Sequence, residues 1–478
     1  MAGCLGGIIG IVSAVAAEPN LPAGLQAENA EPELPAGLEG GGPQLPPGLE
    51  GGEPKLPPGL NGDAETEEAD EAKALADLPF QVTGFVEGRG GVRLHDDEHE
   101  RRATLAEARL QLEFEKDLPG LSLHATTDLV YDTLADSHAI DLETGDGFLD
   151  LREANAIFSP TDFTDAKVGR QILTWGTGDL VFINDLFPKD FNSFFLGRDE
   201  EYLKAPSDAA ELSAFSDIAN LDIVYTPVFD ADRFIDGSRV SFFNPALGRI
   251  TGRDAVIQAD RPDDWFRDDE WALRLYRNFA AYEGALYGYD GFWKSPAGSD
   301  PVSGRATFPR LSVVGGSLRG PLGKGIANLE LGYYDSREDR DGDDPNVRNS
   351  EVRLLAGYEQ ELAKNLTLGL QYYLEHMVDY DDYLDTLPAG TPARDENRHV
   401  LTQRLTWLTL NQNLEWSLFA FLSPSDVDAY LRPRARYKVD DNLSIEAGGN
   451  LFTGRDEHTF FGQFEDNSNL YLALRYGF

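Results

Sequence analysis

Apolar and polar residues alternate through much of the chain after residue 80. The last ten residues read N-L-Y-L-A-L-R-Y-G-F, so Leu470, Leu472, Leu474 and Tyr476 share one face of an extended strand with the terminal Phe478. Side chains of a β-strand point alternately to its two faces, so this pattern predicts a strand with one apolar face. For this strand alone, the end of a soluble β-sandwich is the alternative.

Amphipathic segments of this kind recur up to the C-terminus, and their connections alternate between short and long. Transmembrane barrels have short turns on one side and longer loops on the other. We therefore predict an all-β fold, a transmembrane antiparallel up-and-down β-barrel of about 18 strands. The alternative is about 16 strands, because 220–227 and 238–244 are weak. The predicted strands are 81–95, 102–115, 120–132, 148–158, 164–173, 220–227, 238–244, 268–279, 281–292, 308–318, 325–336, 349–361, 365–378, 396–410, 413–423, 427–438, 442–453 and 467–478.

Two segments precede the barrel, which we expect at 80–478. Residues 1–17 are apolar and end in A-V-A-A, as in a signal peptide, and they contain Cys4, the one cysteine of the chain. Residues 18–79 hold no aromatic residue and are rich in proline, glycine and acidic side chains, which predicts a disordered periplasmic tail. The mature chain is then expected to contain no disulfide.

The tail carries four L-P-[AP]-G-L repeats. Proline favours polyproline II and glycine interrupts helices, so each repeat presents two leucines on an extended backbone. The repeats are either docking points for a periplasmic partner or a plain spacer. Docking would make the barrel one part of a larger envelope assembly for export or electron transfer. The leucines concerned are Leu21, Leu25, Leu34, Leu38, Leu45, Leu49, Leu56 and Leu60.

The formal charge of −42 argues against nucleic acid as a partner, since phosphates would be repelled. An acidic surface suits the lipopolysaccharide layer, where divalent cations screen like charges. Adaptation of the organism to salt is the alternative explanation for this excess of acidic residues. We expect outer-membrane lipid, lipopolysaccharide and the barrel-assembly machinery as partners.

One predicted strand places four cations on a single face: Arg432, Arg434, Arg436 and Lys438, here called the basic ladder. Arg or Lys at the bilayer midplane costs about 2–4 kcal/mol, so this face must line the lumen. Neighbouring strands offer only Glu415 and Glu446 nearby, which predicts an excess of unpaired cations and a preference for anionic solutes. The other cations expected to line the pore are Arg109, Arg152, Arg274, Arg353, Arg404 and Arg475.

The long connection 174–219 is too apolar to extend into water, so we expect it to fold into the barrel mouth as a constriction or plug. Packing on top of the barrel or against a neighbour in a trimer is the alternative. The candidate constriction residues are Trp175, Phe187, Phe191, Phe194, Phe195 and Arg198.

The stretch 148–200 resembles a known group of proteins. L-R-E-A at 151–154, then V-G-R-Q at 168–171 and W-G at 175–176, is similar to the large proteobacterial porins of the alginate-export type. The resemblance implies an 18-stranded channel with an electropositive lumen and a loop-gated pore. It does not transfer alginate as the substrate, and the repeat tail departs from that group.

Little else in the sequence indicates chemistry. Asp339, Asp341 and Asp343 alternate around a glycine and could hold loop-bound Ca²⁺, or form a solvated acidic loop. We predict no catalytic residues, no other cofactor and no enzyme activity. The sequence favours an outer-membrane channel, a porin for passive diffusion or export of small anionic solutes.

Overall fold

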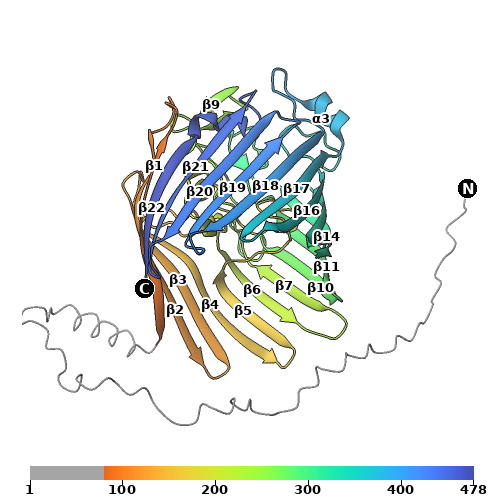
Figure 1. Ribbon diagram of the computed structural model, residues 1–478. Coiled ribbons are helices and arrows are strands. Elements are labelled where there is room, and N and C mark those ends of the chain that lie inside the picture. The colour runs from red at the N-terminus through yellow and green to blue at the C-terminus, as the bar shows by residue number, and fades with distance from the viewer. Residues whose placement is uncertain (1–79) are drawn as a thin grey trace, which may run out of the picture. The chain divides into compact units, whose positions relative to one another are not determined.

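The computed structural model describes residues 80–478, which form one closed antiparallel barrel (Figure 1). Eighteen strands pair in chain order, and β22 (Asn469–Gly477) pairs back onto β1 (Gln81–Arg93). Beyond the last paired residue, Gly84 and Phe478 exchange two backbone hydrogen bonds of 3.1 and 3.0 Å. Closure leaves no free strand edge in the wall. The predicted fold class and strand number are confirmed, and the predictions for residues 1–79 lie outside the described residues.

The remaining elements follow in chain order. Between β1 and β22 the wall contains β2 (Ala103–Leu118), β3 (Leu121–Asp132), β4 (Leu149–Thr161), β5 (Thr164–Gln171), β6 (Ser207–Ala214), β7 (Asn220–Thr226), β10 (Glu270–Phe279), β11 (Tyr282–Phe292), β14 (Arg310–Leu322), β15 (Gly325–Ser336), β16 (Glu351–Ala363), β17 (Leu366–Met377), β18 (Asn397–Thr409), β19 (Leu414–Ser423), β20 (Asp428–Lys438) and β21 (Leu443–Gly454). Connections carry the hairpins β8 (Phe242–Asn244) with β9 (Arg249–Thr251) and β12 (Gly298–Ser299) with β13 (Ala306–Thr307), and the helices α2 (Phe191–Leu196), η1 (Glu200–Leu203), α3 (Tyr380–Thr386) and η2 (Gly462–Asn467). No helix within residues 80–478 is long and apolar enough to cross a membrane.

One wall strand lies elsewhere than predicted. The segment 238–244 contributes only β8, which pairs with β9 outside the barrel sheet, and β7 pairs directly with β10. The wall strand that the sequence pattern did not predict is β6, which lies inside the expected long connection 174–219. Its sequence S-D-A-A-E-L-S-A has one large apolar residue, so its alternation is weak. The link 228–237 therefore belongs to a long loop, and the short turn is 215–219.

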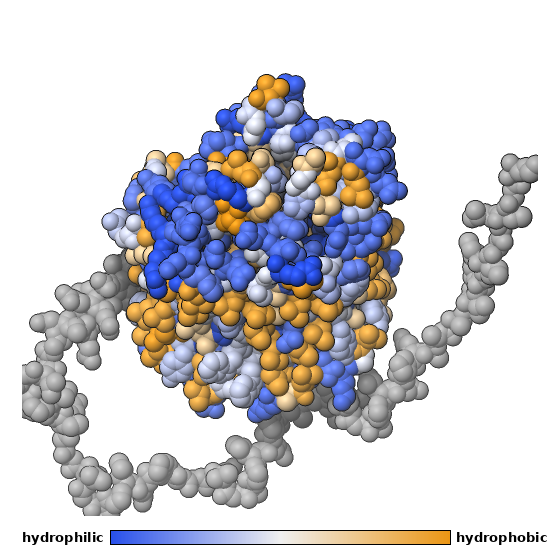
Figure 2. Space-filling model, turned by 90° about the horizontal axis from the view of Figure 1, so that it is seen from above, coloured by the Kyte–Doolittle hydropathy of each residue, from blue (hydrophilic) through white to orange (hydrophobic). Residues whose placement is uncertain are grey.

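The two faces of the wall differ sharply in exposure. In β22 the exposed fraction of Leu472 is 59%, whereas its neighbours Tyr471 and Ala473 are 7% and 2% exposed. Viewed from above, hydrophilic side chains fill most of the visible face, and hydrophobic side chains form a band along its lower edge (Figure 2). Apolar residues thus cover the outside of the wall while charged residues lie within, as the alternation predicts.

A charge added to each face of one strand tests this assignment. Leu405 faces outward near the middle of β18, whereas Thr406 shares the inner face with Arg404. Leu405→Arg should lower the free energy of unfolding in lipid by about 2–4 kcal/mol, because the cation must leave water. Thr406→Arg is the matched control and should change it far less. Urea titration of heat-modifiable gel mobility measures both, and equal losses would contradict the assignment.

Candidate functional site

The connection between β5 and β6 turns inward and carries α2 and η1 against the inner face of the wall. The carboxylate of Asp190 caps α2 by accepting a hydrogen bond from the backbone N–H of Ser193 at 2.7 Å. Gly197 ends the helix with φ of 94°, and an added Cβ there would lie 2.3 Å from the ring of Tyr471. Only glycine combines this backbone conformation with so close an approach to β22.

Aromatic side chains hold α2 against β20 and β21. The ring centroid of Phe195 lies 5.5 Å from that of Tyr430, 5.2 Å from Phe452 and 4.9 Å from Phe464. Rings at these separations and in tilted or edge-on geometry pack favourably beyond the area they bury. The other apolar residues predicted for this segment lie in the same lumenal core: Phe187 and Phe194 are buried, and Trp175 and Phe191 are partly buried.

Polar contacts fix the earlier part of the segment to β14, β15 and β17. Glu330 accepts hydrogen bonds from the backbone N–H of Gly178 at 2.7 Å and from the side chain of Asn184 at 3.0 Å. Gln371 accepts from the N–H of Asp179 at 2.7 Å and donates to its carbonyl at 2.8 Å. The segment 172–206 therefore contacts well-separated parts of the wall and narrows the lumen between them.

The acidic run that begins η1 reaches the basic ladder. Glu200 lies 2.9 Å from the guanidinium of Arg404 and 3.6 Å from that of Arg432. Arg434 pairs with Glu415 on the adjacent strand, as the strand register allows. The predicted excess of unpaired cations is therefore wrong for Arg432. Its partner comes from a distant loop, and adjacent strands give no sign of such a contact.

Asp199 extends the same arrangement along the wall. It lies 3.6 Å from both Arg436 and Arg475, and Arg475 also contacts Glu201 at 3.0 Å. Asp199 and Glu200 thus contact the ladder from the lumen side, and Glu201 contacts Arg475 on β22. Sequence reasoning missed them, although three acidic residues directly after an apolar loop segment were a usable signal.

The other predicted pore-lining arginines also face inward and have partners. The guanidinium carbons of Arg109 and Arg152 lie 4.1 and 4.5 Å from the ring centroid of Tyr202, on η1. Arg274 pairs with Glu283 at 3.0 Å, and Arg353 with Glu351 at 2.8 Å. Arg198, predicted for the constriction, pairs with Glu107 at 2.8 Å. Lys438 is exposed near the short turns, where it lines an opening of about 380 Å³ with Glu415 and Arg436.

The predicted calcium residues do not converge. Asp339 is buried and uses its carboxylate within its own turn, accepting from the N–H groups of Asp343 at 3.1 Å and Asp344 at 3.2 Å. Asp341 and Asp343 point into solvent. A carboxylate that closes its own turn resembles a calcium ligand in sequence.

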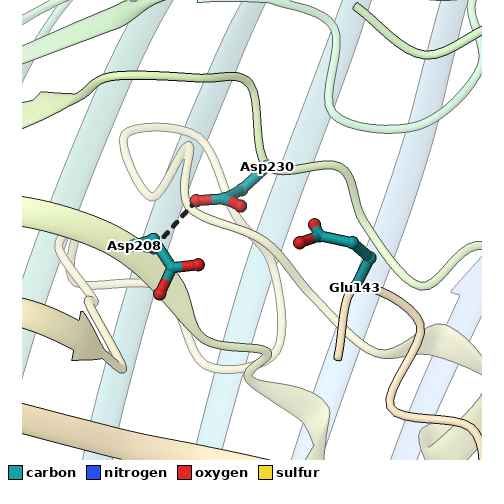
Figure 3. A group of neighbouring side chains, drawn as sticks. All are labelled: Glu143, Asp208 and Asp230. Atoms are coloured by element: carbon teal, nitrogen blue, oxygen red, sulfur yellow. Dashed lines mark hydrogen bonds between the residues drawn. The ribbon is translucent and has the colours of Figure 1, made fainter. Parts of the chain in front are cut away.

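The described part of the chain brings three other carboxylates together, those of Glu143, Asp208 and Asp230 (Figure 3). Their oxygens lie within 4.8 Å of one another, and Asp230 accepts a hydrogen bond from the N–H of Asp208 at 3.0 Å. Burial raises the pKa of the Asp230 carboxyl to about 8. The raised pKa favours the neutral form of this carboxyl, which lowers the repulsion among the three acidic groups.

Comparison with known proteins gives distant structural likenesses only. No protein-family model and no curated protein matches the sequence. The chain is similar to OccAB1 of Acinetobacter baumannii at 10% identity and a TM-score of 0.49, covering 83% of this chain and 96% of that one. OccK3 (OpdO) of Pseudomonas aeruginosa is 12% identical with a TM-score of 0.47, covering 83% of this chain and 95% of that one. The outer-membrane channel DcaP of A. baumannii is 11% identical with a TM-score of 0.40, covering 84% of this chain and 97% of that one. With scores below 0.5, the fold assignment rests on the strand pairing itself.

The aromatic contact gives a prediction for the inserted segment. Phe195→Ala should weaken the docking of α2 by about 3–5 kcal/mol, because a buried ring is removed and a cavity is left. Amide hydrogen exchange over residues 190–203 should speed up while the wall strands stay protected. Phe163→Ala, at a side chain that is 59% exposed, is the control and should leave this exchange unchanged. Unchanged exchange in both variants would show that α2 does not depend on this ring.

The buried carboxyl of Asp230 gives a second prediction. Its pKa is raised from 3.8 to about 8 on folding, so the wild-type protein should lose stability as pH rises through this window. Asp230→Asn removes the ionisation and keeps an oxygen that can accept from Asp208. The Tm of the variant minus that of the wild type should therefore increase from pH 5 to about pH 9. A difference that is constant across this range would contradict the raised pKa.

Proposed function

We propose that this chain is a bacterial outer-membrane channel through which small solutes pass by diffusion or export, without covalent chemistry. The observation that carries the proposal is a closed 18-stranded wall whose outer face is apolar and whose inner face is charged. A bilayer matches the outer face, because it demands apolar contact and no free backbone groups. A charged lumen narrowed by an inserted loop matches a selective pore.

The same proposal includes a preference for anionic solutes. The cavity between η1 and the ladder is lined by four cations, Arg198, Arg404, Arg432 and Arg434, and by three carboxylates, those of Asp199, Glu200 and Glu446. Cations therefore outnumber carboxylates by one around this small cavity even though most are paired. In a confined, poorly screened space a small majority of one sign is enough to favour the opposite ion.

A second candidate is a barrel that serves a larger envelope assembly. The four L-P-[AP]-G-L repeats favour it, because a plain spacer does not require paired leucines. Under this proposal a periplasmic partner binds the repeats while the barrel supplies the passage through the membrane.

Conductance separates a channel from a sealed barrel. The full chain, refolded and shown to be heat-modifiable, should produce stepwise ion currents in planar bilayers, and heat-denatured protein should produce none. A correctly folded barrel without conductance would refute the channel function and leave the fold intact.

Ion selectivity tests the anion preference. Replacing Arg432, Arg434 and Arg436 by Gln should lower the anion-to-cation permeability ratio, measured as reversal potential in a salt gradient. The matched control replaces three exposed arginines, Arg102, Arg267 and Arg455, whose side chains are 75%, 81% and 70% exposed. Both variants lose three charges, so a ratio that falls equally in both would show that the ladder has no special role.

A further inference from the structure

Ion pairs in the barrel differ in length and in burial, and two pairs serve as examples of the two extremes. Arg233 holds Asp150 through two hydrogen bonds of 2.9 and 2.8 Å, and both side chains are at most 6% exposed. Arg432 and Glu200 are instead 3.6 Å apart, and the Glu200 side chain is 33% exposed. Tight, buried pairs are costly to break, whereas long, solvated pairs contribute little. A long, solvated pair can therefore exchange partners far more readily than a tight, buried one.

The loose pairs gather where the acidic run meets the ladder. Among residues 80–478, Glu200 is the carboxylate within ion-pair distance of Arg432, and Asp199 is the one within that distance of Arg436. Each contact is 3.6 Å long, beyond ordinary hydrogen-bond distance. Both carboxylates belong to one inserted segment, whereas both guanidinium groups belong to β20.

We propose that Asp199 and Glu200 determine anion specificity by acting as internal counter-ions that occupy the basic ladder in place of a solute carboxylate. This inference rests on the proposed channel function. An anionic solute passes the ladder by taking over the guanidinium contacts of these carboxylates and releasing them to water. These two carboxylates therefore compete with anionic solutes for the ladder. The ladder attracts anionic solutes less strongly than its arginines alone would.

The local structure is compatible with such an exchange. The backbone around Asp199 and Glu200 is held by buried neighbours, since Phe195, Leu196, Tyr202 and Leu203 are each at most 5% exposed. Side-chain rotation of the two carboxylates then frees Arg432 and Arg436 without undocking the segment, and a full release of Glu200 to water also breaks its 2.9 Å contact with Arg404. A carboxylate on a solute presents the same two oxygens to a guanidinium, so the exchange preserves charge and the number of contacts.

The test removes the negative charges of Asp199 and Glu200 and keeps side chains of nearly the same shape. In Asp199→Asn/Glu200→Gln, the side chains stay nearly isosteric, and the new amide can still accept from the N–H of Glu201, as Asp199 does at 3.4 Å. The matched control is Asp341→Asn/Asp343→Asn, which removes the same charge from an exposed loop. The anion-to-cation permeability ratio should rise by about twofold or more in the first variant and stay at the wild-type value in the control. Glu200→Asp in place of Glu200→Gln keeps the charge and should return the ratio toward wild type.

A binding measurement keeps the inference testable apart from conduction. Succinate titrated into the folded, detergent-solubilised barrel should bind more tightly to the Asp199→Asn/Glu200→Gln variant than to the wild type or the control. If no variant conducts but succinate affinity rises in this way, the channel proposal fails and the internal competitor stands. A permeability ratio and a succinate affinity that both match the control would overturn the inference. If the double variant loses its heat-modifiable fold, Glu200→Gln alone is measured against the same criteria.

Discussion

Closure of the wall is the constraint on which the rest of this molecule depends. A closed antiparallel sheet pairs every wall strand on both sides, and strict alternation then sends every second side chain into a confined lumen. Charges that cannot face lipid accumulate there, so each needs a partner in the same space. The wall alone does not supply enough of them, and the inserted segment contributes Asp199, Glu200 and Tyr202 to arginines on five different strands.

Alternation of apolar and polar residues is a local property of the sequence, and it predicted the features that depend on local sequence. Strands with strong alternation, such as β20 and β22, lie close to their predicted positions, and the apolar run 182–195 lies inside the barrel because its side chains need burial. β6 was missed because small and polar residues dominate both of its faces. The segment that contains β8 was predicted as a wall strand, because an alternating pattern does not specify which sheet a strand joins.

The partners of the ladder could not be predicted in this way. Cross-strand neighbours follow from register, which places Glu415 opposite Arg436 and diagonal to Arg434, so a contact between Glu415 and one of these arginines was foreseeable once β19 and β20 were placed. The contact of Arg432 with Glu200 joins a strand to a loop far away in sequence, and no period relates them. In the acidic loop, Asp339 accepts from two N–H groups of its own turn, and composition alone does not separate such a carboxylate from one that binds a ligand.

The position of the inserted segment in the chain also bears on the order of assembly. Residues 172–206 precede β15, β17, β20 and β21 in the chain, and these strands provide the surfaces that the segment packs on. Its docking site does not exist until the later strands have joined the sheet. Filling of the lumen is therefore a late event in folding, and the growing barrel must accommodate an exposed apolar segment until its second half is in place.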